Sequence, residues 1–168
     1  IFENNKMITQ KHACIEKGGS DTIPHIYCKH PRNNAVKSYA IIIEDLDSGH
    51  KRDQNWTHWI VSYLSITLDD NGNVTNEFTI PNINSFSGDI SSIGDDQREI
   101  IQGLNSWDNI GYRGMCPPKG TIHNYKLSVY ALKAKIECED CTRLSLLSKM
   151  NGIILYTGSI IAKFKSSK

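Results

Sequence analysis

Three stretches of the chain carry the hydrophobic pattern of β-strands. Residues 38–45 form a short β-branched run that ends in carboxylates, as expected of a central strand buried on both faces. Residues 58–67 alternate well enough to predict a second strand. Residues 124–133 predict a third strand, one face of which carries Tyr125, Leu127, Val129 and Ala131. These strands are expected to make the central sheet.

The remaining pattern predicts shorter elements. Residues 70–73 carry an Asn-Gly turn signal, which predicts a hairpin or tight turn before a strand near 76–80. The single good helix candidate covers residues 142–150, with Asn151-Gly152 as its stop and an apolar stripe of Leu144, Leu147 and Met150. Residues 153–164 predict a last strand, broken by Gly158. The predicted class is mainly β with one or two short helices.

Length and charge narrow the classes of function. A chain of 168 residues suits one domain, residues 1–168, with a full core. Its 19 basic and 18 acidic residues leave a net charge of +1, so no global field recruits nucleic acid. No stretch reaches the apolar length of a membrane span. Residues 1–20 lack a signal-peptide pattern, so a cytoplasmic protein is expected; the alternative is a secreted or periplasmic protein that has lost its signal peptide.

The cysteines predict at least one free thiol, because Cys14, Cys28, Cys116, Cys138 and Cys141 are odd in number. Cys138 and Cys141 have CxxC spacing, but no second CxxC and no nearby histidine pair completes a zinc site. A loop disulfide or two free thiols are therefore favoured over a metal there. No metal or other cofactor is predicted.

The segment from residue 111 to residue 125 is the most informative part of the chain. Gly111, Gly114 and Gly120 permit unusual backbone angles, whereas Pro117 and Pro118 fix φ, so this segment predicts a rigid but open pocket wall. It leads into the third strand, where a histidine and a tyrosine two residues apart project from one face: His123 and Tyr125. Both are expected to meet the same ligand.

Carboxylates and imidazoles are expected to gather beside this wall. Asp45 ends the first strand, Asp47 lies just outside it and His58 opens the second strand. If those strands are antiparallel neighbours, their joined ends lie at one edge of the sheet, and a matching strand direction brings His123 there too. One cavity would then be lined by Asp45, Asp47, His58, His123 and Tyr125.

Such a cavity favours an oxyanion. A histidine beside a carboxylate is expected to have a raised pKa, and its cation can donate to a phosphate in a charge-assisted bond. Amides around Gly111 to Gly114 are expected to add neutral donors. One aspartate would orient an imidazole, and the other would accept from a protonated phosphate, an ammonium or a hydroxyl group of the ligand. A head group that carries both charges would suit this site.

Each candidate also has a plainer interpretation. Asp47 fits a turn former, and His58 fits a hydrogen-bonded core histidine. Arg113 fits a solvated loop charge, Tyr112 a packing residue, and Cys116 a small buried hydrophobe. The four other histidines, which fit no constellation, are interpreted as surface or structural residues: His12, His25, His30 and His50.

These same residues resemble the phosphatidylethanolamine-binding protein family, also called the Raf kinase inhibitor protein family, and in particular its bacterial and archaeal-type branch. Its Asp-Pro-Asp-Ala-Pro motif resembles Asp45-Leu46-Asp47-Ser48-Gly49, and its Trp-x-His-Trp segment is similar to Trp56-Thr57-His58-Trp59. Its long signature resembles residues 103–107, 111–118 and 123–125. Both prolines of the first motif are absent, and Met115 stands where a proline is usual, so the pocket rim is expected to differ from that of relatives.

The resemblance implies a β-sandwich around a large antiparallel sheet and a small cavity that binds phosphate, acetate, phosphorylated groups or phospholipid head groups. Carried over residue by residue, its ligand positions are Asp45, Asp47, His58, His123, Tyr125 and the 111–118 loop, within which Gly111, Tyr112, Gly114, Cys116 and Pro117 are the candidate ligand-binding residues. Family members are mostly regulators, so the resemblance implies an inhibitor or regulator of a protein kinase or protease.

Two alternatives remain open from the sequence. A His–Asp pair can act as a general base, which allows a hydrolase acting on a phosphoester or ester. The chain offers no Gly-x-Ser-x-Gly elbow and no activated thiol, so no catalytic residue is assigned and binding is favoured over catalysis. The other alternative is a protein that inhibits its partner through its outer surface, with a vestigial cavity.

Overall fold

The computed structural model describes residues 2–49, 55–84, 92–94 and 96–167. The strands are β1 (Thr22–Ile23), β2 (Ile26–Lys29), β3 (Ser38–Asp45), β4 (Trp56–Ser65), β5 (Glu77–Ile80), β6 (Ile83–Asn84), β7 (Ser92–Ile93), β8 (Arg98–Gln102), β9 (Ile122–Leu132) and β10 (Ile154–Lys165). The α-helix α1 spans Arg143–Met150, and two 3₁₀ turns span Gln10–His12 and Ile15–Lys17.

The large sheet has six strands in the order β10-β9-β3-β4-β8-β7, and every paired neighbour is antiparallel. The three strands predicted from the pattern, β3, β4 and β9, occupy its centre. Asp45 at the end of β3 lies opposite Trp56 on β4 and opposite Tyr125 on β9. The start of β4, the end of β3 and the start of β9 therefore meet at one edge, as the sequence predicted.

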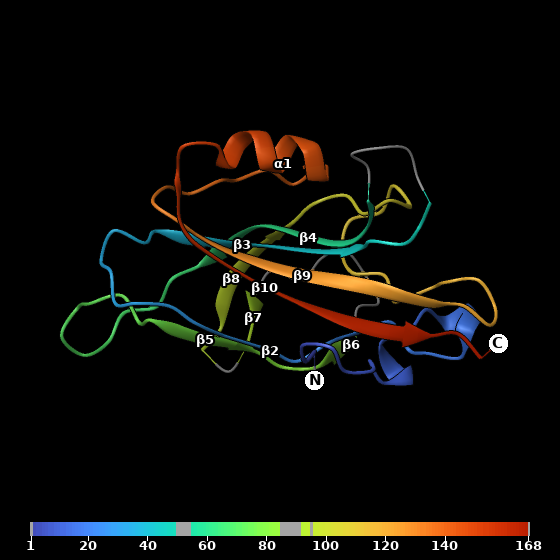
Figure 1. Cartoon of the computed structure of the whole chain (residues 1–168). Helices are drawn as coiled ribbons and strands as arrows, with labels where there is room; N and C mark the ends of the chain where they lie inside the picture. Colours follow the sequence, from blue (N-terminus) through green and yellow to red (C-terminus); the bar gives the residue numbers. More distant parts are fainter. Residues whose placement is uncertain (1, 50–54, 85–91, 95, 168) are drawn as a thin grey trace.

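Both faces of this sheet are covered, which explains the uniformly buried β3. Figure 1 shows α1 over one face and the layer containing β2, β5 and β6 below the other. Side chains of β3 alternate between two cores: Tyr39, Ile41 and Ile43 face the small sheets, whereas Ala40 and Ile42 lie under the helix. The apolar face predicted for β9 packs in the larger of these cores. A mainly β sandwich around a large antiparallel sheet is thus confirmed.

Two details of the predicted elements were wrong. In α1, Met150 is buried and Leu147 packs against the core as predicted, but Leu144 is 52% exposed and Leu146 is buried in its place. The helix docks on Ile42 and Ile60, and this contact selects the buried face. Nor does Gly158 break the last strand, because it pairs with Val129 in a ladder that runs without a register shift from Tyr156 to Lys165.

Strand β8 was not predicted, because its ends are polar. Arg98 and Gln102 are both buried, and each has a partner on β4: Arg98 donates to the Ser65 carbonyl, and Gln102 accepts from the Trp59 indole. Only one of the three buried positions of β8 is apolar, Ile100, so the strand has no alternating hydrophobic pattern and local sequence does not identify it.

The histidines outside the predicted cavity divide into different environments. His12 and His30 are buried, and each donates through Nδ1–H to a backbone carbonyl, of Thr22 and Pro31 respectively, which agrees with a structural role. His25 is partly exposed. His50 lies outside the described residues.

Two disulfides tie the fold together. Cys14 is joined to Cys116, 102 residues away, and Cys138 is joined to Cys141 within the loop before α1. Cys28 is a free cysteine, which confirms the prediction of at least one free thiol. The Cys138–Cys141 bond is one of the two alternatives favoured for that CxxC. The long-range bond had no signal in the sequence.

Candidate functional site

A cavity of about 410 Å³ lies at the sheet edge where β3, β4 and β9 meet. Both aspartates and both histidines of the predicted constellation line it: Asp45, Asp47, His58 and His123. Cys116, Pro117 and Pro118 supply part of the wall, as expected of the glycine- and proline-rich loop. The tertiary structure therefore gathers residues that span about 80 positions of the chain around one hollow.

Asp45 and His123 form the polar pair at the centre of the cavity. Asp45 Oδ2 and His123 Nδ1 are 2.7 Å apart, and both side chains are largely buried. Asp45 Oδ1 accepts from the Asp47 amide at 2.8 Å, so this carboxylate is held in one orientation. Because Asp45 engages Nδ1, the nitrogen of His123 that remains for a ligand is Nε2. Asp45 is thus placed to orient the imidazole.

Asp47 is an exposed residue at the rim of the cavity. Its Oδ2 accepts from the backbone amide and the side-chain amide of Asn124, each at 2.7 Å. These bonds join the segment after β3 to the start of β9, so Asp47 links two distant segments and does not form a local turn through its side chain. One carboxylate oxygen of Asp47 remains to accept from a ligand.

His58 behaves differently from the expectation for a histidine beside a carboxylate. Its side chain is buried, and Nδ1 donates to the carbonyl oxygen of Arg113 at 2.8 Å. Burial lowers the pKa of His58 to about 4, outweighing the Arg113 bond and the charge of Asp45, both of which favour the cation. The raised pKa predicted for this imidazole is therefore wrong. His58 presents a neutral ring whose Nε2 can accept a proton from a ligand.

Unfolding should become easier as the pH falls, in part because of His58. An unfolded histidine takes up a proton near pH 6.5, whereas folded His58 does so only near pH 4. Between these values the unfolded chain binds more protons, so acid favours unfolding by up to about 1.4 kcal/mol per pH unit from this group. His58→Asn keeps a donor for Arg113 without titrating, so we expect its stability to fall less between pH 7 and pH 5.

Denaturant unfolding of both proteins at the two pH values measures this difference. All other titrating groups are shared by the two proteins, so the difference between their pH slopes isolates His58. Identical slopes would show that His58 is not kept neutral by burial.

Three amides of the 111–118 loop are bonded within the protein and are not available as anion donors. The Gly111 amide donates to the Gly103 carbonyl at 3.4 Å, the Arg113 amide to the His58 carbonyl at 2.9 Å, and the Gly114 amide to Asp21 Oδ1 at 2.6 Å. The predicted concave nest is therefore wrong for these three groups, because they fix the loop instead. Gly111 and Gly114 position the wall and do not line the cavity.

The two predicted site tyrosines lie behind the cavity lining. Tyr112 is buried and donates through its hydroxyl to the His12 carbonyl at 2.8 Å, so it packs, as its plainer interpretation held. Tyr125 is fully buried between the imidazoles, with ring centroids 5.3 Å from His58 and 6.5 Å from His123. Its hydroxyl forms no hydrogen bond within normal geometry to the described residues. Burial first, and then the charge of Asp45, raise the pKa of Tyr125.

Three lining residues were not among the predicted ligand positions: Ser48, Trp56 and Trp107. Trp56 precedes His58 by two residues on β4, so the period-two alternation of a strand could have identified it. The Trp107 ring lies 5.1 Å from both Trp56 and His58, in edge-to-face geometry. Trp107 reaches the site from a loop, and a loop has no periodic pattern from which the direction of a side chain can be predicted.

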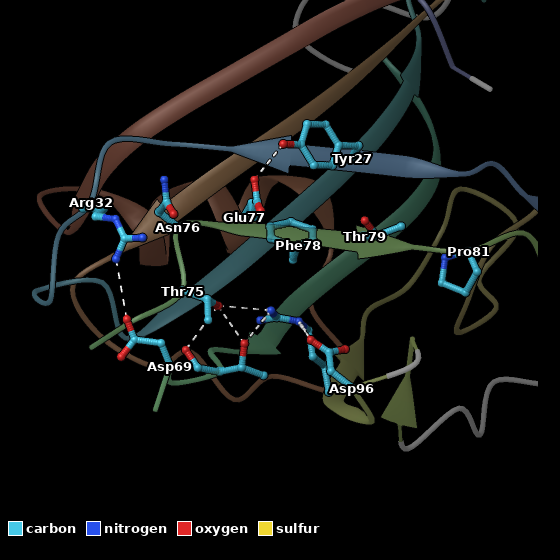
Figure 2. A pocket seen from close by; sticks show the side chains of 12 residues that line it. Tyr27, Arg32, Asp69, Thr75, Asn76, Glu77, Phe78, Thr79, Pro81 and Asp96 are labelled. Carbon is cyan, nitrogen blue, oxygen red and sulfur yellow. Dashed lines mark hydrogen bonds and ion pairs between the residues drawn. The ribbon is translucent and has the colours of Figure 1, made fainter. Parts of the chain in front are cut away.

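Two further hollows are weaker candidates. The one in Figure 2, about 430 Å³, lies beside β5 and β8. Its buried cation, Arg98, is already engaged: it pairs with Asp96 at 2.7 Å and donates to Ser65 O and Thr67 Oγ1. Arg32 pairs with Asp69 at 3.5 Å across the same hollow. A second hollow of about 380 Å³, near the start of α1, contains no histidine.

One group of described residues has ligand atoms close enough to share a metal ion: Cys14, Glu16 and Cys116. The two sulfurs are joined to each other, and Glu16 forms an ion pair with Arg113. A disulfide offers no thiolate, so this group does not fit a metal site in its oxidised form. Among the described residues, no helix has both the length and the apolar character needed to cross a membrane.

Comparison with known proteins places this geometry in context. Residues 1–165 match a family model described as phosphatidylethanolamine-binding protein. A UPF0098 protein of Archaeoglobus fulgidus is 30% identical over 167 residues, which make up 99% of this chain and 50% of that protein. A UPF0098 protein of Aquifex aeolicus is 30% identical over 171 residues, covering 98% of this chain and 84% of the relative. The chain thus spans about half the length of the Archaeoglobus relative.

Two solved structures share the fold. A putative phosphatidylethanolamine-binding protein homolog from Chlamydia trachomatis has a TM-score of 0.68 and 25% identity, covering 98% of this chain and 92% of its own. An Escherichia coli protein, YbcL, described as a new member of the mammalian family of that name, has a TM-score of 0.72 and 22% identity. It covers 98% of this chain and 93% of its own. At that identity the likeness to YbcL concerns the fold alone.

Proposed function

Because this chain belongs to the phosphatidylethanolamine-binding protein family, we propose that its cavity binds a phosphorylated group, either inorganic phosphate or a phosphorylated head group. The observation that carries the proposal is the Asp45–His123 pair at 2.7 Å, set in a hollow that His58 also lines. A protonated His123 offers Nε2–H to a phosphate oxygen while Asp45 balances its charge. Neutral His58 accepts from a protonated phosphate oxygen.

The biological role that we propose is regulation. Residues 1–168 act as one domain that recognises the phosphorylated group and thereby regulates or inhibits a protein partner, a kinase or a protease. The cavity contains no free thiol, since Cys116 is bonded to Cys14. This absence of a thiol nucleophile supports binding over covalent catalysis.

The two disulfides also support a location for this function. Disulfides persist in oxidising compartments and are rare in the cytosol. The Cys14–Cys116 and Cys138–Cys141 bonds therefore favour a secreted or periplasmic protein over the cytoplasmic location expected from the sequence.

Phosphate should bind more tightly below the ordinary titration range of histidine than above it. Protonation gives His123 a positive charge and a second N–H donor, and a charge-assisted bond is worth about tenfold in affinity. Calorimetric titration at about pH 5.5 and about pH 8.5 measures this difference. Sulfate serves as the control, because its charge is constant over this range whereas phosphate itself titrates. Equal sulfate affinity at both pH values would contradict binding through a charged imidazole.

A hydrolase is the second candidate, and the same Asp45–His123 pair favours it. An imidazole oriented by a carboxylate can accept a proton from water and activate it against a phosphoester. Incubation with para-nitrophenyl phosphate tests this candidate, because turnover lost in His123→Ala would assign catalysis to the cavity. Binding of phosphate without any turnover would support the binding function instead.

A further inference from the structure

The wall of the cavity is backed by the N-terminal segment, residues 12–21. Cys14 N donates to Met115 O at 3.1 Å, and Met115 N donates to His12 O at 3.2 Å. Asp21 accepts from the Gly114 amide, and Ala13 forms a parallel bridge with Met115. We call residues 12–21 and residues 112–116 together the clasp. The clasp ends at Cys116, which lines the cavity, and it positions the next two lining residues, Pro117 and Pro118.

The Cys14–Cys116 disulfide is the covalent part of the clasp. Cys14 is completely buried, whereas Cys116 is partly exposed and lines the cavity. Cys116 is therefore the half of the disulfide that faces the cavity, whereas Cys14 is closed to solvent. A ligand that fills the cavity covers Cys116. The disulfide and the anion site thus share one opening.

We propose that the Cys14–Cys116 disulfide is a redox switch for the anion cavity, a proposal that rests on the phosphate-binding function above. Oxidised, the bond holds residues 116–118 against the N-terminal segment and keeps the cavity formed. Reduced, the same wall loses its covalent bond and keeps its hydrogen bonds, the apolar packing of Tyr112 and Met115 and the Arg113–Glu16 ion pair, and affinity for phosphate falls. The cavity therefore binds phosphate tightly in oxidising compartments and not in the reducing cytosol.

The chemistry of the switch is thiol–disulfide exchange with an external dithiol. A thiolate of the dithiol attacks Cys116 Sγ, a mixed disulfide forms and the Cys14 thiolate leaves. The second thiol of the dithiol then attacks the first sulfur of the same dithiol, which is bonded to Cys116 in the mixed disulfide. This attack closes the oxidised dithiol and releases the Cys116 thiolate. The protein disulfide gains two electrons and two protons, and the dithiol becomes a disulfide. A protein or small-molecule dithiol supplies this couple.

The second disulfide of the chain serves as an internal control for the reduction experiment. The Cys138–Cys141 disulfide closes the loop before α1, and neither cysteine lines the phosphate cavity. Cys28, the free cysteine, has a pKa raised to about 11 by burial, so its thiolate is scarce at neutral pH. Reduction of the two bonds can therefore be followed separately by thiol labelling and peptide mass analysis.

The test measures phosphate affinity by calorimetry in the oxidised protein and after reduction with dithiothreitol. We expect an affinity about five- to tenfold lower after reduction, in the usual range of coupling between two sites. The coupling between two sites is reciprocal. Bound phosphate should therefore lower the equilibrium constant for reduction of Cys14–Cys116 by the same five- to tenfold and leave that of Cys138–Cys141 unchanged. The variant Cys138→Ser/Cys141→Ser should bind phosphate as the wild type does.

Three other outcomes would each contradict the proposed redox switch, and the measurements distinguish them from one another. Equal affinity in the oxidised and reduced proteins would reject the switch while leaving phosphate binding in place. Absence of phosphate binding to the oxidised protein would reject the proposed function, and the switch with it. Loss of the near-ultraviolet circular dichroism signal on reduction would show that the bond holds the whole fold, which also rejects a local switch.

Discussion

Replacing His123 with alanine is expected to abolish measurable phosphate binding. His123 is the imidazole that Asp45 orients at 2.7 Å, and it supplies the cationic donor that the proposed site needs. Removing it also leaves Asp45 as an uncompensated carboxylate facing the anion. Loss of a charge-assisted bond together with added repulsion should lower the affinity by about 100-fold or more. Calorimetric titration with phosphate at about pH 5.5 measures the loss.

The matched control is His25→Ala, which removes a partly exposed histidine that does not line the cavity. It should bind phosphate as the wild type does. His123→Asn is a second useful variant, because an amide restores a neutral donor but no charge, and it should bind weakly at both pH values. Wild-type affinity in His123→Ala would place the phosphate elsewhere and remove the basis of the proposed function.

Replacing Gly114 with alanine is expected to destabilise the protein by about 3 kcal/mol or more. A Cβ at Gly114 would lie 2.3 Å from the Ala13 carbonyl carbon and 2.5 Å from the Cys14 nitrogen. Both are backbone atoms, and the disulfide and hydrogen bonds of the clasp hold them in place. The loop must therefore move away from the N-terminal segment, which also displaces Cys116 and weakens phosphate binding.

Denaturant unfolding under oxidising conditions measures this effect against Gly158→Ala. A Cβ at Gly158, inside β10, meets no described atom within 4 Å. Alanine there should be neutral or stabilising by up to about 1 kcal/mol, because glycine in a strand loses more conformational entropy on folding. Equal stability of the two variants would mean that the N-terminal segment does not back the loop.

The central strands could be predicted because their burial is uniform along each face. β3 is apolar on both sides, and β9 places its apolar residues at every second position. Strand β8 lacked this pattern, because Arg98 and Gln102 are buried polar residues, each with a partner on β4. Helix α1 carried more than one apolar stripe, and only docking on the sheet decided that Leu146 is buried.

The charged and imidazole lining of the cavity was predictable, whereas four other predicted ligand positions do not line it: Gly111, Tyr112, Gly114 and Tyr125. Asp45, Asp47, His58 and His123 all follow from strand ends that share one edge of an antiparallel sheet. The protonation state of His58 was predicted wrongly, because the depth of its burial outweighs the carboxylate nearby. The loop amides were predicted as ligand donors, but neighbouring segments had already engaged them.

The order of apolar and polar residues by itself determined the main strands and the edge at which acidic and imidazole groups end, because strand alternation and antiparallel pairing are local and repetitive. Only the tertiary structure decided that His58 stays neutral and which loop amides are hydrogen-bonded within the protein. It also decided that Cys14 is bonded to Cys116, 102 residues away. These properties depend on burial depth and on contacts between distant segments, and neither produces a periodic pattern of residues in the sequence.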